Sequence, residues 1–244
     1  MQIQTFQNPE QLAIHTANFI INLVKNKPNA TLILTSGDTP VLTYKKIVEL
    51  AQPTDFEQVT IIGLDEWVGI PATSEGSCRY IVEENLLKPL GITSNQYTFF
   101  DSMTHDLEAE CKRVDKLLFD AGGADFIIVG VGVNGHIGLN EPGTSFENYC
   151  HISELAEITI SVGQKYFTQN TQLTQGITIG LKHLLEAKIA VLIASGERKA
   201  MVIERMLAEE PNVDFPATVF KLHNNSYVWL DEAASSLIET KNMI

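Results

Sequence analysis

The sequence predicts an α/β fold built on a largely parallel sheet. Short runs of β-branched and other apolar residues alternate with longer segments whose apolar residues recur at helical spacing, which is the pattern of βαβ crossovers. The run from Phe126 to Val131 ends among glycines and has the composition of a central strand that is covered on both faces. Open α/β sheets bind their ligands beyond the carboxyl ends of such strands.

The first elements follow from apolar spacing and turn residues. Apolar side chains recur on one face of residues 8–25, and Asn8-Pro9 is a typical helix start. Residues 31–34 form a short apolar run that predicts a strand, and the turn after it contains Pro40. Because proline suits the first turn of a helix, we expect a helix over residues 41–50.

The middle of the chain continues the alternation. Residues 59–64 predict a strand, and residues 77–87 and 106–119 predict helices. The central strand is then expected at residues 126–130.

The last segments complete the βαβ pattern. Helices are expected at residues 180–185 and 197–208, and strands at residues 189–194 and 227–230. Because no internal repeat, low-complexity tract or linker interrupts residues 1–244, we expect a single domain.

Composition narrows the classes of partner. The chain has 17 Lys and Arg against 30 Asp and Glu, a net charge of −13, which argues against nucleic acid or an anionic membrane as the main partner. A small anionic substrate stays compatible, because a phosphate site needs only local amides and one or two cations. The three cysteines form neither a disulfide framework nor a zinc pattern, and residues 19–24 are too short an apolar block for a membrane span. We therefore expect a cytoplasmic protein.

Polar residues follow four of the predicted strands. Because the carboxyl ends of parallel strands share one edge of a sheet, we expect these residues to converge. They are Ser36, Gly37, Asp38 and Thr39; Asp65 with Glu66; Asn134, His136 and Glu141; and Lys199 after Ser195-Gly196.

The Ser36 to Thr39 loop lies between a strand and a helix. Its backbone N–H groups, the helix N-terminus and two hydroxyls suit an anion. An ordinary βα turn with a capping residue would explain the same sequence segment. The charge of Asp38 would also repel a phosphate unless its side chain points away. Lys165 and Lys199 are candidate cations for such an anion, although either residue also fits a plain surface lysine.

Acid–base chemistry is indicated by His136 and Asp65. A neutral imidazole accepts and returns a proton when a neighbour fixes its tautomer; Glu141 is the natural orienting acceptor, and Asn134 can join the network. A carboxylate directly after a strand, as at Asp65, suits a general base, but it also fits a solvated strand end. No His-x-His, His-Glu-x-x-His or Cys/His cluster appears, so neither a metal nor another cofactor is expected.

Three segments resemble the glucosamine-6-phosphate deaminase (isomerase) family, and the similarity runs over nearly the whole chain. They are SGDTP, LDEWVG and above all GVGVNGHIGLNEPGTSF. LDEW with GSCRY, NEPGTSFENYCHIS and QGITIGLK look nearest to the galactosamine-6-phosphate isomerase branch. The resemblance implies a Rossmann-like three-layer fold, a monomer or homo-oligomer, and conversion of a 2-amino-2-deoxyhexose 6-phosphate to a ketohexose 6-phosphate plus ammonia.

The resemblance also implies roles for the candidate residues. His136 would open the sugar ring, oriented by Glu141 and Asn134, and Asp65 would move a proton between C2 and C1. The Ser36 to Thr39 loop, Lys165 and Lys199 would hold the phosphate. Lys165 stands where arginine is usual in part of the family, which loses a bidentate phosphate contact.

Two other functions remain open from the sequence. A 6-phosphogluconolactonase would share the fold and a glycine–histidine loop, but Glu141 and the LDEW segment favour the deaminase. A non-catalytic sugar-phosphate sensor is the second alternative hypothesis, and Asp38 in the phosphate loop is the residue that best supports it.

Overall fold

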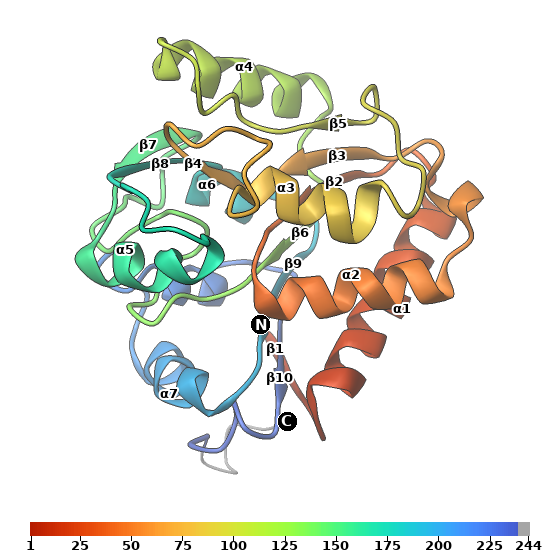
Figure 1. Cartoon of the computed structure of the whole chain (residues 1–244). Coiled ribbons are helices and arrows are strands. Elements are labelled where there is room, and N and C mark those ends of the chain that lie inside the picture. Colours follow the sequence, from red (N-terminus) through yellow and green to blue (C-terminus); the bar gives the residue numbers. More distant parts are fainter. Residues whose placement is uncertain (239–244) are drawn as a thin grey trace.

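The computed structural model describes residues 1–238, and a twisted parallel sheet lies at its centre (Figure 1). Within these residues the sheet has the order β1-β10-β9-β6-β2-β3-β5, and every pair of neighbours is parallel. The strands are β1 (Gln2–Phe6), β2 (Thr31–Leu34), β3 (Thr60–Gly63), β5 (Tyr97–Thr98), β6 (Phe126–Val129), β9 (Ala190–Ala194) and β10 (Ser226–Asp231).

Helices cover both faces of this sheet (Figure 1). Alternate strand side chains enter two separate apolar cores: Ile33 of β2 points into one, and Leu32 and Leu34 point into the other. The core that contains Leu32 and Leu34 is covered by α1 (Pro9–Asn26), α2 (Asp38–Leu50) and α3 (Cys78–Val82). Helix α3 continues into a π-helical turn (Glu83–Leu87). The core that contains Ile33 is covered by α4 (Leu107–Asp120), α6 (Leu181–Glu186) and α7 (Ala200–Ala208). The predicted three-layer α/β fold is confirmed.

A second, antiparallel sheet stands beside the first. It consists of β4 (Asp65–Trp67), β8 (Gln175–Thr178) and β7 (His151–Glu154), in that order. Asp65 and Glu66 follow a strand of the main sheet, as predicted, but they also begin a further strand that the sequence analysis did not predict. Only Leu64 separates β3 from β4, and the chain there leaves one sheet and enters the other.

Most predicted elements are present with small shifts. Helix α1 begins at Pro9, because the Asn8 side chain caps it by accepting from the Gln11 N–H at 2.9 Å. The helix expected from residue 197 opens with a 3₁₀ turn (Glu197–Lys199) before α7. The prediction missed β1, β5, the small antiparallel sheet and α5 (Glu157–Gly163).

The strand order fixes where a ligand site belongs. From β2 the chain proceeds to β3 and β5 on one side, and it later places β6, β9 and β10 on the other. The direction of winding therefore reverses between β2 and β6, which is the position at which open α/β sheets form a crevice at their carboxyl edge.

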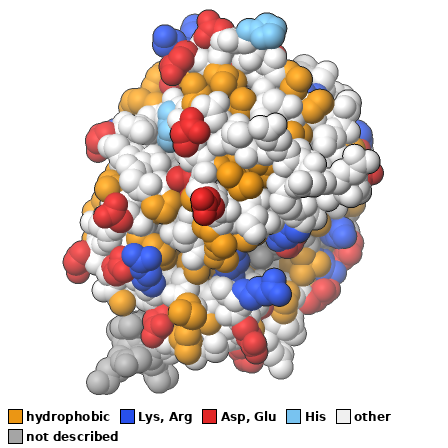
Figure 2. Space-filling model, turned by 60° about the vertical axis from the view of Figure 1, so that its left-hand side comes forward, with side chains coloured by type: hydrophobic (Ala, Val, Ile, Leu, Met, Phe, Trp, Pro, Cys, Tyr) orange, Lys and Arg blue, Asp and Glu red, His pale blue; other side chains and the backbone are white. Residues whose placement is uncertain are grey.

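The surface shows charges of both signs. On the face in Figure 2, Lys and Arg side chains are scattered among acidic and apolar ones, in keeping with the net charge of −13. Among residues 1–238, no helix combines the length and apolarity needed to cross a membrane.

Gly180 is the position at which the loop before β7 packs against the start of α6. A Cβ atom there would lie 2.0 Å from the Tyr149 carbonyl oxygen and 2.1 Å from that of Asn148. We expect Gly180→Ala to lower the free energy of unfolding by about 1–3 kcal/mol in urea denaturation, because backbone must move to admit the methyl group. Gly130→Ala is the matched control, since apart from its two chain neighbours no atom of residues 1–238 lies within 4 Å of its Cβ position. Equal urea midpoints for the two variants would contradict this packing.

Candidate active site

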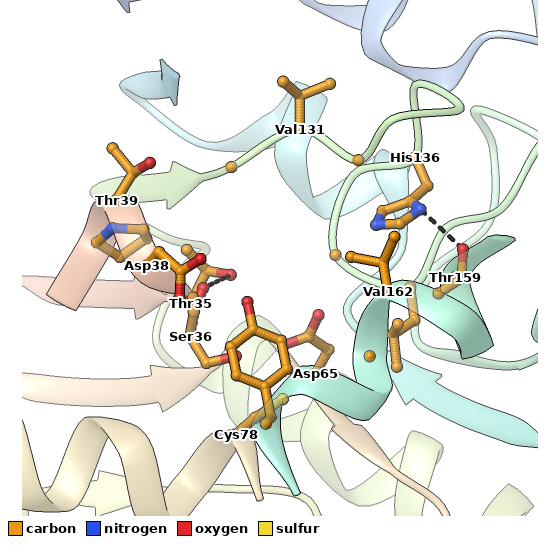
Figure 3. Close-up of a pocket in the computed structure, with 18 of the residues that line it drawn as sticks. Thr35, Ser36, Asp38, Thr39, Asp65, Cys78, Val131, His136, Thr159 and Val162 are labelled. Carbon is orange, nitrogen blue, oxygen red and sulfur yellow. Dashed lines mark hydrogen bonds between the residues drawn. The ribbon is translucent and has the colours of Figure 1, made fainter. Parts of the chain in front are cut away.

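A cavity of about 930 Å³, its open mouth included, lies at the carboxyl edge of the main sheet (Figure 3). The segments that follow β2, β3, β6 and β9 all contribute to its wall, through Ser36, Asp65 at the start of β4, His136 and Lys199 among others. The predicted convergence of four strand ends is therefore confirmed. Asn134 and Glu141 are not among the lining residues and lie behind His136.

Asp65 is a buried carboxyl group that faces this cavity. The residue is 7% exposed, and among residues 1–238 its Oδ1 atom has no hydrogen-bond partner. Burial is the main cause that raises its pKa, to about 7, and the charge of Glu66 raises it further, while a hydrogen bond from the Cys78 thiol lowers it. Asp65 is thus suited to exchange a proton near neutral pH.

Glu66 holds the segment that carries Asp65. Its carboxylate accepts from the Ser77 hydroxyl at 2.6 Å and from the Cys78 and Arg79 backbone N–H groups at 3.0 Å each. These bonds fasten the N-terminus of α3 to β4 and place Cys78 against Asp65. Burial raises the pKa of Glu66, and the same hydrogen bonds lower it. The sequence marked Glu66 only as a neighbour of Asp65, whereas its contacts are structural.

His136 also lines the cavity, from the loop that follows β6 (Figure 3). Its ring lies against Gly132, where a Cβ atom would come within 2.4 Å of both ring nitrogens, so only glycine allows this position. Burial lowers the pKa of His136, the charge of Glu141 raises it and that of Lys199 lowers it. The imidazole is therefore neutral at pH 7 and able to accept a proton.

The contact that orients the imidazole differs from the expected one. Nδ1 of His136 lies 3.1 Å from the Thr159 hydroxyl of α5 but 3.7 Å from Oε2 of Glu141, which is too long for a hydrogen bond. Glu141 instead accepts from Asn134 Nδ2 at 2.8 Å, and Asn134 Oδ1 accepts from the His136 backbone N–H at 3.3 Å. The two residues shape the loop, and Thr159, which the sequence analysis missed, touches the ring.

The Ser36 to Thr39 segment forms the start of α2. Gly37 is the N-cap residue, and among residues 1–238 no side chain caps this helix. The first N–H groups, which have no intrahelical partners, are therefore left without a side-chain acceptor as well. The Tyr44 hydroxyl donates to the Thr35 carbonyl at 2.5 Å and ties the loop to its own helix. This geometry suits an anion.

Lys199 lies at the predicted helix start and reaches across the cavity edge. Its Nζ donates to the Val131 carbonyl at 2.6 Å. Burial and then the charge of Lys165 lower its pKa, and the charge of Asp38 raises it.

Lys165 and Asp38 meet at the mouth of the cavity. Their Nζ and Oδ2 atoms are 2.5 Å apart, and the side chains are 46% and 75% exposed. Lys165 belongs to a 3₁₀ turn (Gln164–Tyr166) that follows α5, so the pair joins α5 to the start of α2. The Asp38 side chain therefore lines the cavity and contacts a candidate cation; it does not point away from the candidate phosphate site.

A second polar cluster lies outside the cavity. Asp115, Cys150 and His183 bring potential metal ligands within 4.8 Å of one another, which the spacing in the sequence did not indicate. Oδ1 of Asp115 accepts from His183 Nε2 at 2.7 Å and from the Cys150 N–H at 2.9 Å. Burial is the main cause that raises the pKa of the Cys150 thiol, and its hydrogen bond to Asp115 raises the pKa further. These contacts fit a hydrogen-bonded structural cluster.

The buried Asp65 carboxyl group should weaken the fold at neutral pH. The pKa of Asp65 is about 7 in the folded protein, against an ordinary value of 3.8. The loss of folding stability that its ionisation causes is therefore absent below pH 3.8, grows as the pH rises to 7 and is constant above pH 7. We expect Asp65→Asn to raise the free energy of unfolding at pH 8 by about 2–4 kcal/mol, and much less at pH 4.5. Urea denaturation at the two pH values measures this, and an equal effect at both would contradict a raised pKa.

The chain matches known proteins over nearly its full length. The family model described as glucosamine-6-phosphate isomerases/6-phosphogluconolactonase matches residues 7–229. A glucosamine-6-phosphate deaminase of Bacillus pumilus is 37% identical over 97% of this chain and 100% of its own length. The putative deaminase AgaI of Escherichia coli K12 is 37% identical over 91% of this chain and 89% of its own.

Solved structures agree with these matches. A monomeric glucosamine-6-phosphate deaminase of the NagB superfamily superposes with a TM-score of 0.93 at 32% identity and covers 97% of this chain and 100% of its own. A 6-phosphogluconolactonase from Trypanosoma brucei gives a TM-score of 0.79 at 17% identity, with 98% of both chains covered, which is a likeness of fold. The chain belongs to the glucosamine-6-phosphate isomerase/6-phosphogluconolactonase family.

Proposed function

We propose that this chain is an amino-sugar-6-phosphate deaminase. It converts glucosamine 6-phosphate or galactosamine 6-phosphate to the ketohexose 6-phosphate and ammonia. The observation that carries the proposal is the pairing of a buried Asp65, whose pKa is about 7, with a neutral His136 in one cavity. Its relatives named as deaminases support the same activity.

His136 opens the sugar ring in this proposal. The neutral imidazole takes the proton of the anomeric hydroxyl and returns a proton to the ring oxygen as the bond from C1 to that oxygen breaks. The hydroxyl of Thr159 holds Nδ1, so Nε2 is the nitrogen left to face the sugar. Asn134 and Glu141 keep the loop in the conformation that presents the ring.

Asp65 then moves one proton between two carbons. The ionised carboxylate removes the proton from C2, and the C1 oxygen takes a proton from solvent water, which gives an enolamine. The protonated Asp65 delivers its proton to C1, and the C1 hydroxyl stays in place while C2 becomes an imine. Water adds to this imine, and ammonia leaves C2 as the ketone forms. The steps are proton transfers, addition of water and loss of ammonia, and the electrons move only between C1 and C2 of the sugar, so the proposed reaction requires no external oxidant or reductant and no metal or organic cofactor.

The phosphate is held at the N-terminus of α2. Ser36, Gly37 and Thr39 offer backbone N–H groups and hydroxyls, and Lys199, which also lines the cavity, adds a positive charge. This places the sugar between Asp65 and His136. We propose that residues 1–244 act as one catalytic domain in the cytoplasm, as a monomer or homo-oligomer, without nucleic acid or membrane as partner.

A lactonase and a sugar-phosphate sensor are the alternatives. Asp65, a buried base with a pKa near 7, lines the same cavity as His136 and is suited to remove a proton from carbon. A lactonase does not need this step, and a sensor carries out no reaction. The comparison with Trypanosoma brucei lactonase extends only to the fold.

A direct assay separates these functions. We expect the purified chain to release ammonia from glucosamine 6-phosphate or galactosamine 6-phosphate, with the ketose product identified by mass spectrometry and NMR. His136→Gln and Asp65→Asn should each lower kcat by roughly 10²–10⁴-fold, because each removes a proton-transfer group. Hydrolysis of 6-phosphogluconolactone alone would make the chain a lactonase, and binding of both sugars without turnover would make it a sensor.

The pH dependence of turnover follows from Asp65. The carboxylate must be ionised to take the C2 proton, so kcat/KM should fall as the pH drops through about 7. His136→Gln should keep this acid limb at its lower rate, since the limb belongs to the other residue. A limb centred near pH 4 would show that the base is not the buried Asp65.

A further inference from the structure

We propose that Asp38 is an internal competitor for the substrate phosphate. In the free protein its carboxylate neutralises Lys165, and the phosphate must take over this cation in order to bind. Asp38 thereby sets the affinity for sugar phosphates. The inference rests on the proposed function only in so far as a phosphate binds at the start of α2.

The contact itself is well placed for competition. Nζ of Lys165 lies 2.5 Å from Oδ2 of Asp38 and 4.7 Å from the centre of the Tyr166 ring, so the cation already has an anionic and an aromatic partner. Both paired side chains line the cavity, and both are substantially exposed. A ligand that enters therefore reaches this ion pair without any rearrangement of the core.

Asp38 also occupies the electrostatic position that a phosphate would use. It is the first residue of α2, where the helix dipole and the free N–H groups favour negative charge. A phosphate dianion that binds these groups would lie in the same turn as the Asp38 carboxylate, and two like charges at such short range repel each other.

The charges at the mouth form one coupled set. Lys165 and Lys199 carry two positive charges, and Asp38 cancels one of them. The pKa of Lys199 is lowered by Lys165 and raised by Asp38, which places all three within electrostatic reach of one another. Removal of the Asp38 charge therefore raises the net charge of these three side chains, which an incoming phosphate meets, from about +1 to about +2.

Asp120 provides a matched control for an Asp38 substitution. It forms an exposed ion pair with Lys116 on α4 at 2.6 Å, and neither residue lines the cavity. Asp120→Asn changes the net charge and removes an exposed Asp–Lys pair just as Asp38→Asn does, but it leaves the mouth of the cavity intact.

Calorimetric titration with fructose 6-phosphate tests the proposal. We expect Asp38→Asn to lower Kd about two- to five-fold at low ionic strength, the range that an exposed ion pair supports, and Asp120→Asn to leave it unchanged. Added salt should shrink the difference, because it screens exposed charges. In a Lys165→Gln background the Asp38→Asn effect should shrink, since the competition for that cation is gone and only the direct repulsion between Asp38 and the phosphate remains. With an active parent, the change should appear in KM more than in kcat.

Two results would overturn the proposal. If Asp38→Asn binds fructose 6-phosphate equally or more weakly than the parent, the ion pair positions Lys165 for the ligand. If Asp38→Asn changes Kd by the same factor with and without Lys165, the two residues act separately. Binding is measured without turnover, so a chain that binds fructose 6-phosphate but releases no ammonia refutes the proposed function and still tests Asp38. Failure of all variants to bind fructose 6-phosphate refutes the inference about Asp38.

Discussion

Burial of the Asp65 carboxyl group is the constraint on which the proposed site depends. A carboxylate without hydrogen-bond partners for one oxygen is unfavourable in a protein interior, and the surrounding structure maintains it. Glu66 fixes the backbone through α3, and the antiparallel pairing of β4 with β8 holds the strand itself. These contacts hold Asp65 at the junction of the two sheets, where the residue is buried.

The remaining polar groups surround Asp65 because the strands are parallel. The turn after β2 provides an anion site, the loop after β6 provides His136, and the segment after β9 provides Lys199. Helix α5 closes the arrangement from the side of the small sheet, with Thr159 on the imidazole and Lys165 just beyond it on Asp38. In our account the cavity separates ring opening from carbon proton transfer, and each task has its own titratable group.

The sequence alone predicted the parallel sheet and the convergence of its loops, because both follow from local apolar patterns and from the geometry of βαβ units. It did not predict β4, β7 and β8, since strands of only three or four residues leave little local signal, and β4 pairs with β8 across more than 100 positions. The edge strand β1 is largely polar and was missed for a similar reason. The Thr159 and Asp38 contacts depend on where α5 lies, which only the tertiary structure shows.

The most direct measurement is the titration of the Asp65 carboxyl group itself. Infrared difference spectra between the parent and Asp65→Asn, recorded from pH 4 to 9, isolate the carboxyl and carboxylate bands of this residue. Our account predicts a transition near pH 7, because burial is the main cause of its raised pKa. A transition near the ordinary value of 3.8 would mean that the carboxylate is solvated, and Asp65 would then lack the basicity that the proposed proton transfer requires.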